Sequence, residues 1–199
     1  GKIRNVNYFI NKVRPRLEAG ELSGMEANNM HYLGEMYFFR AYIYYTKLVA
    51  LGDFPILKQW ISEDYETVRE ASKRRPRNEV ARFILQDLDS AYYYMKTTAP
   101  MSNRLNKDCA ALLKSRVALF EGTWEKYHKG TARVPGGPGW PGAEKDYLKD
   151  FTIDIDSEIK FFLTEAKEAA QIVADKYPLF NDYPSLFNSQ SLSNASEVL

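Results

Sequence analysis

The fold is decided by one stretch, residues 34–55, which runs GEMYFFRAYIYYTKLVALGDFP. Apolar residues recur every three or four positions from Met30 to Leu51, which is the spacing of one face of an α-helix. Gly52 suits a helix C-cap, and Pro55 cannot continue a helix, because it lacks a backbone N–H. We therefore expect a long helix that ends near residue 51 and presents an aromatic-rich surface.

The same periodicity predicts further helices on both sides of this stretch. One covers residues 3–17 and contains Pro15, so it should kink or stop in its last turn. Residues 23–26, Ser-Gly-Met-Glu, have the spacing of a capping box for the long helix. Later helices are expected to start near Pro76, to follow Asn106 as N-cap, and to run from Asp156 or Ser157 to Tyr177.

No segment alternates with a period of two over a useful length, so the predicted fold class is all-α. The four later helices pair as two helical hairpins, the unit of a tetratricopeptide-like α-α superhelix. Long irregular loops, residues 53–75 and 129–155, connect them. Hairpins alone leave a concave apolar face partly uncovered, so we expect a partner or a missing half of the protein to cover it.

Composition excludes several classes of protein. The chain has 199 residues, with 45% hydrophobic and 27% charged residues, which suits one globular domain, or one and part of another. A net charge of +1 provides no field that would attract nucleic acid or anionic lipid. The single cysteine, Cys109, excludes an intrachain disulfide and a cysteine-based zinc site. Aromatic residues make up 14%, which suits crowded helix interfaces or a binding surface.

Catalytic and metal-binding patterns are absent from the sequence. His31 and His128 have no partner at metal-ligand spacing, and the glycine-rich residues 136–142 lack the lysine of a phosphate-binding loop. The acidic residues of 150–158 suit a helix N-terminus better than a calcium site, because they lack the order of an EF-hand. We predict no enzyme activity, no cofactor and no metal site.

Two tryptophans lie in predicted loops, Trp60 and Trp140. An exposed tryptophan offers an apolar plate on which the C–H face of a sugar ring can rest, so both are candidate ligand-binding residues. For Trp140 an equal alternative is a loop anchor that packs against the domain. The aromatic residues of the predicted helices favour packing between helices instead.

Residues 34–55 closely resemble the signature of SusD/RagB proteins, which are outer-membrane nutrient-binding lipoproteins. Residues 75–91 resemble the next helix of that family, and residues 107–128 resemble the one after it. The match covers roughly residues 5–199 in several ordered motifs. Within the signature, Glu35 and Arg40 are charges on a mostly buried helix and are expected to form ion pairs between helices, while Asp53 orders the turn after Gly52.

The resemblance implies a non-catalytic protein at the surface of the outer membrane. Family members capture oligosaccharides or other nutrients and act with a SusC-like TonB-dependent transporter. It further implies that residues 1–199 are the N-terminal helical region, with the family's C-terminal half and its lipid-bearing cysteine outside this sequence. No binding residue transfers by motif. The alternative hypothesis is a helical-repeat scaffold that binds a protein or peptide partner.

Overall fold

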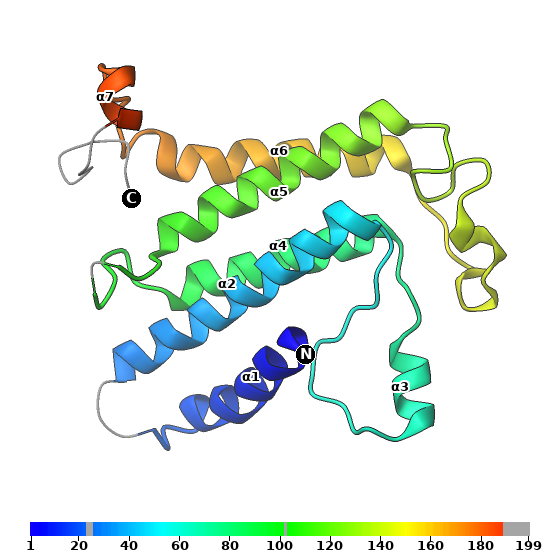
Figure 1. The fold of residues 1–199 in the computed structure, drawn as a ribbon, viewed down its shortest axis with the longest axis horizontal. Helices are drawn as coiled ribbons and strands as arrows, with labels where there is room; N and C mark the ends of the chain where they lie inside the picture. Colours follow the sequence, from blue (N-terminus) through cyan, green and yellow to red (C-terminus); the bar gives the residue numbers. More distant parts are fainter. Residues whose placement is uncertain (23–25, 102, 189–199) are drawn as a thin grey trace.

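The computed structural model describes residues 1–22, 26–101 and 103–188 and confirms the all-α prediction (Figure 1). The described residues contain no β-strand, only one isolated antiparallel bridge between Phe54 and Arg75. The predicted capping box over residues 23–26 lies largely outside the described residues. The elements are α1 (Lys2–Glu18), α2 (Glu26–Leu51), α3 (Tyr65–Ala71), α4 (Arg77–Tyr94), α5 (Lys107–His128), η1 (Pro141–Glu144), η2 (Asp146–Leu148), α6 (Ile155–Ala174) and α7 (Tyr183–Asn188).

The longer helices form the two predicted hairpins. α2 packs against α4, α5 packs against α6, and the contact between α4 and α5 joins the pairs. α1 lies along α2 at one edge. In Figure 1, α2 and α5 form a front layer and α4 and α6 lie behind them. This arrangement is the tetratricopeptide-type stacking that the sequence predicts.

The hydrophobic core runs continuously through both hairpins. Its main cluster joins Tyr44 and Leu48 of α2 to Ile84 of α4, Val117 of α5 and Phe162 of α6. All five side chains are fully buried, and burial of each contributes on the order of 2 kcal/mol. A second cluster lies under α1, where its apolar face meets α2 and α4.

Side-chain caps explain where two of the helices begin. The Asn106 side chain accepts a hydrogen bond from the Cys109 N–H, which confirms the predicted N-cap of α5. Asp154 caps α6 by accepting from the Ser157 N–H, so α6 begins one residue before the predicted position. α6 ends at Ala174, short of the predicted Tyr177. α1 continues through Pro15 and ends at Glu18, one residue after the predicted end of the helix.

The two long connections both lie at one end of the hairpins, on the right in Figure 1. Residues 53–75 contain the short helix α3, which the sequence analysis did not predict, and residues 129–155 contain η1 and η2. The bridge between Phe54 and Arg75 brings together the two ends of the 53–75 connection. Among the described helices, none combines the length and the hydropathy that crossing a membrane requires.

Candidate functional site

Arg40 forms a buried ion pair between α2 and α4. Its Nε and Nη2 atoms each donate to an Asp87 oxygen at 2.7 Å, and its Nη1 donates to Asn7 Oδ1 at 2.8 Å and to the Lys58 carbonyl at 3.0 Å. Burial raises the pKa of Asp87 although Arg40 opposes the shift. The predicted interhelix pair is confirmed, and it also ties α1 and the 53–75 connection to the hairpin.

Glu35 accepts two hydrogen bonds from Arg104, which lies on the connection between α4 and α5 rather than on a helix. Its Oε1 lies 3.4 Å from Nε2 of the buried His31. His31 Nδ1 accepts from the Lys96 N–H at 3.1 Å, and burial lowers the pKa of this histidine. His31 is therefore a packed residue that, with Glu35, holds the 95–106 connection against α2.

Asp53 joins three segments at the end of α2. Its Oδ1 accepts the Arg77 N–H in the first turn of α4 at 2.9 Å, and its Oδ2 accepts from Trp140 Nε1 at 2.8 Å. Burial raises the pKa of this carboxyl, against the effect of both hydrogen bonds. The Asp53 side chain thus joins the end of α2 to α4 and to the 129–155 connection.

The expectation that Trp140 is an exposed ligand plate is wrong. The residue is only 5% exposed, and its ring packs against Phe151 with centroids 5.3 Å apart. Any side chain at Gly142 would overlap this ring. Its indole N–H is used by Asp53, so Trp140 is the loop anchor that the alternative interpretation described.

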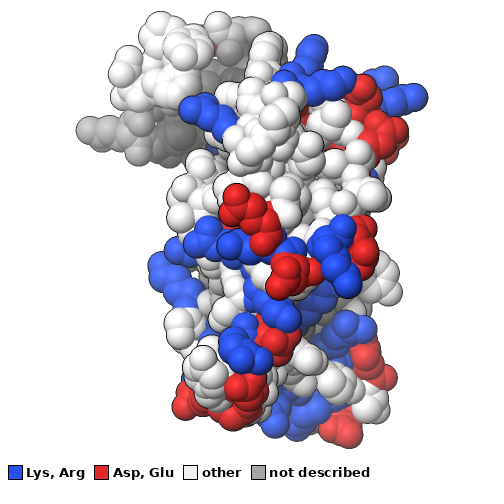
Figure 2. Space-filling model, turned by 90° about the vertical axis from the view of Figure 1, so that its right-hand side faces the viewer, with Lys and Arg blue, Asp and Glu red and all other residues white. Residues whose placement is uncertain are grey.

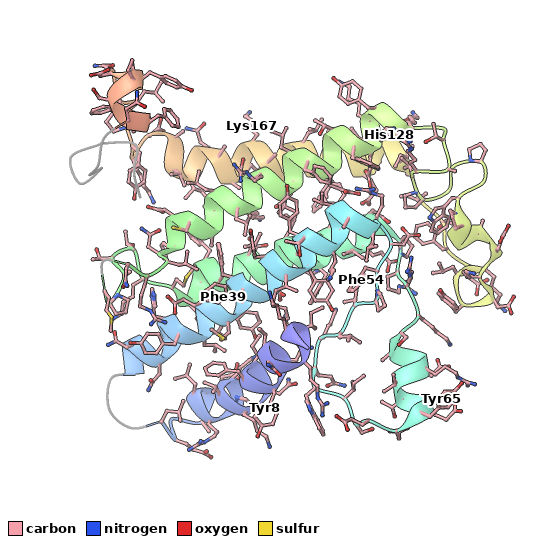
Figure 3. The ribbon with its side chains drawn as sticks, viewed as in Figure 1. Tyr8, Phe39, Phe54, Tyr65, His128 and Lys167 are labelled. Carbon is pink, nitrogen blue, oxygen red and sulfur yellow. The ribbon has the colours of Figure 1, made fainter. Side chains whose placement is uncertain are left out.

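Trp60 is exposed, as expected of a loop tryptophan, with 44% of its surface accessible. Its backbone N–H donates to Asn11 Oδ1 at 2.7 Å, which holds the residue beside α1. Tyr8, labelled on α1 in Figure 3, is 53% exposed. Together they line a hollow of about 460 Å³. We call this region the Trp60 surface; it comprises Tyr8, Asn11, Lys12, Gln59 and Trp60.

A larger hollow of about 570 Å³ lies between the end of α2 and the 129–155 connection. The sequence analysis did not predict this hollow, because its residues come from three segments that are far apart in the sequence. The basic residues 73–75 were the one local feature that pointed to it. Trp140 lies in its wall. We call this hollow the loop pocket; its lining includes Leu51, Asp53, Arg74, Arg77, Trp124, Arg133, Trp140, Lys145 and Tyr147.

The acidic residues that begin α6 act as predicted for a helix N-terminus. Asp154 caps the helix, Asp156 pairs with Lys129 at 2.6 Å, and Glu158 accepts two hydrogen bonds from Arg82. Within the part of the chain that the structure describes, no three His, Cys, Asp or Glu side chains are placed to hold a metal ion.

Glu125 of α5 is a buried carboxyl that the sequence analysis missed. Among the residues that the structure describes, neither of its oxygens has a hydrogen-bond partner, and the residue is fully buried. Burial, together with the nearby Glu121 and Glu158, raises its pKa to about 9, while Arg77 and Arg82 oppose the shift. Glu125 is therefore protonated at neutral pH.

Comparison with known proteins identifies the scaffold. No protein-family model matches the chain, and no curated protein matches it. Among solved structures, a SusD-like protein from Bacteroides fragilis is 25% identical, with a TM-score of 0.51 over 64% of this chain and 23% of its own. A SusD-like carbohydrate-binding protein from the same organism gives 11% identity and a TM-score of 0.54, over 89% of this chain and 28% of its own.

A third solved structure, one with a xylogluco-oligosaccharide, is 19% identical with a TM-score of 0.53, over 93% of this chain and 31% of its own. The chain thus spans less than a third of the length of each of these three proteins. TM-scores of 0.51 to 0.54 show that these structures share the fold of this chain. The chain therefore shares the fold of solved SusD-like proteins.

Proposed function

We propose that this chain is the N-terminal helical region of a non-catalytic glycan-binding protein. The whole protein would sit lipid-anchored at the surface of the outer membrane, capture oligosaccharides and deliver them to a SusC-like TonB-dependent transporter. The observation that carries this proposal is the SusD-like fold, since one neighbour of that fold is a carbohydrate-binding protein and another holds a xylogluco-oligosaccharide.

Within the described residues, the Trp60 surface is the best candidate for glycan contact. Trp60 and Tyr8 are exposed rings that flank a hollow with amide groups of Asn11 and Gln59 in its wall. Aromatic rings can stack on the apolar face of a sugar while amides and Lys12 hydrogen-bond to its hydroxyls. Each such contact is weak in water, so binding requires several of them together.

Substitution of Trp60 tests this surface. In affinity electrophoresis on immobilised xyloglucan and other neutral polysaccharides, Trp60→Ala should abolish the retardation that the unmodified protein shows. Tyr93→Ala is the matched control, because Tyr93 is an exposed aromatic residue on α4, outside the Trp60 surface. Equal retardation of all three proteins would remove Trp60 from the binding surface.

A second candidate function, binding of a protein partner, is favoured by exposed apolar residues on the front helices. Phe39, Tyr42 and Val49 are exposed on α2, and Leu112 and Leu119 are exposed on α5. Exposed apolar patches are typical of protein interfaces. A stable complex with the transporter that soluble sugar does not affect would favour this function, whereas competition by sugar would favour glycan capture.

A further inference from the structure

We propose that the loop pocket binds the anionic group of an acidic oligosaccharide, a carboxylate or a sulfate. This inference rests on the proposed glycan-binding function and names the chemical class of a ligand for it. The site is separate from the Trp60 surface, since the two share no lining residue.

The charges that line the loop pocket are mostly positive. Its lining contains four basic residues and one carboxylate, Asp53, although the chain as a whole has a net charge of only +1. Both Asp53 oxygens already accept hydrogen bonds, from the Arg77 N–H and from Trp140 Nε1. The guanidinium of Arg77 is itself occupied, because it donates twice to the buried Glu121 at 2.7 Å.

Three cationic groups of the lining remain available to a ligand. Arg74, Arg133 and Lys145 are exposed, and within the described part of the chain none of their charged groups forms an ion pair or a hydrogen bond. The positive charge of Arg74 also opposes the rise in the pKa of Asp53 that burial causes. Figure 2 views the molecule from the end where the two long connections lie and shows basic side chains on that face among acidic and uncharged ones.

The rest of the lining suits a sugar ring rather than a bare ion. The Arg77 guanidinium carbon lies 4.3 Å from the centroid of the Trp124 ring. Tyr147 and Leu51 add exposed apolar surface to the lining. A volume of about 570 Å³ lies within the range of small-molecule sites. Two arginines and a lysine supply planar and point-charge donors for carboxylate or sulfate oxygens.

The tryptophans of the chain provide a direct measurement. The chain has three, and two of them, Trp124 and Trp140, line the loop pocket. The variant Trp60→Phe therefore reports on this pocket by tryptophan fluorescence and also removes the indole of the Trp60 surface. We would titrate it with oligogalacturonate, a sulfated carrageenan oligosaccharide and neutral xyloglucan oligosaccharide, and repeat each titration by calorimetry.

We expect at least one acidic ligand to bind more tightly than the neutral one, with affinity that falls as salt is added. The carboxylated and sulfated ligands then distinguish the two sources of negative charge. In the same background, Arg133→Gln or Lys145→Gln should weaken that binding about tenfold, as loss of a charge-assisted hydrogen bond does. Lys167→Gln on α6, which removes an exposed lysine outside the pocket, should leave it unchanged.

Other results would overturn the inference. Equal affinity for acidic and neutral oligosaccharides would show that charge is not recognised. If Lys167→Gln and Arg133→Gln lowered the affinity for the acidic ligand equally, that ligand would be attracted by surface charge in general and not bound by the loop pocket. If the unmodified protein binds neutral glycan while the acidic ligands give no signal, only this inference fails; if it binds no glycan of any kind, the proposed function fails with it.

Discussion

At the scale of single residues, the buried carboxyl groups differ in whether an arginine is hydrogen-bonded to them. Asp87 and Glu121 are buried, and each receives two donors of one arginine. Glu125 lies one helical turn after Glu121 and receives no hydrogen bond from any residue in the described ranges. A buried carboxylate without a partner costs several kcal/mol, and protonation avoids most of that cost. Burial raises the pKa of all three carboxyl groups, and a hydrogen-bonded arginine opposes that shift for Asp87 and Glu121.

We predict that Glu125→Gln stabilises the protein in mildly alkaline solution. The folded pKa of about 9 lies above the usual 4.5, so this group favours folding at low pH, and that contribution is lost progressively as pH rises from 4.5 to 9. Urea unfolding should give similar free energies for variant and parent near pH ~5 and a higher value for the variant near pH ~8. Glu165→Gln, which removes a carboxylate paired with Lys114, should show no gain at either pH; a gain there equal to that of Glu125→Gln would contradict the explanation.

A second prediction at this scale concerns the two tryptophans. Trp140→Phe retains an aromatic ring but removes the hydrogen bond to the partly buried Asp53, so the free energy of unfolding should fall by about 1–2 kcal/mol. Trp60→Phe should change it by less than about 0.5 kcal/mol, because the Trp60 side chain is exposed. Chemical denaturation of both variants measures the difference, and similar losses would contradict the anchor role of Trp140.

At the scale of elements, α2 approaches the end of α4 closely at Gly34. A Cβ at this position would lie 2.7 Å from Met95 Cγ and 2.9 Å from the Met95 backbone nitrogen. Gly34→Ala should therefore lower the melting temperature, although alanine favours a helix by about 1 kcal/mol over glycine. Lys47→Ala, at an exposed position of the same helix, is the control. If Gly34→Ala raised the melting temperature, the close contact between α2 and Met95 would relax at little cost, and the prediction would be wrong.

The elements also show what sequence patterns can predict. The five long helices were predictable, because each carries a buried apolar stripe such as Val80, Ile84 and Leu88 on α4. The helix α3 was not, because it buries no residue. Its only local signal is Asp64, which accepts a hydrogen bond from the Thr67 N–H as an N-cap.

The candidate site was harder to predict from sequence than the fold. A tryptophan between glycines and prolines suits both an exposed plate and a loop anchor, and only the position of Asp53, 87 residues away in sequence, distinguishes them for Trp140. The loop pocket likewise brings Arg74 together with Arg133 and Lys145, which are far from it in the sequence. Local patterns predict local structure, whereas such sites depend on how distant segments meet.

At the scale of the whole molecule, Asn7 joins α1 to the rest of the fold. The side chain is buried; its Nδ2 donates to the carbonyls of Leu57 and Gln59, and its Oδ1 accepts from Arg40. Asn7→Ala should lower the free energy of unfolding by about 1–3 kcal/mol. It should also speed amide hydrogen exchange in residues 57–61. Exchange that is unchanged there would show that other contacts hold this segment; Asn5→Ala, at an exposed position of α1, is the control.

The bridge between Phe54 and Arg75 has a consequence for how this scaffold can be altered. Its two backbone hydrogen bonds, both 3.1 Å long, join the two ends of the 53–75 connection. The chain therefore leaves α2 and enters α4 at neighbouring points. Between those points, the outermost part is α3, which buries none of its residues. A new sequence inserted in place of α3 would therefore form a closed loop and leave the hairpin of α2 and α4 unchanged. Related chains could exchange this segment without disturbing the helices.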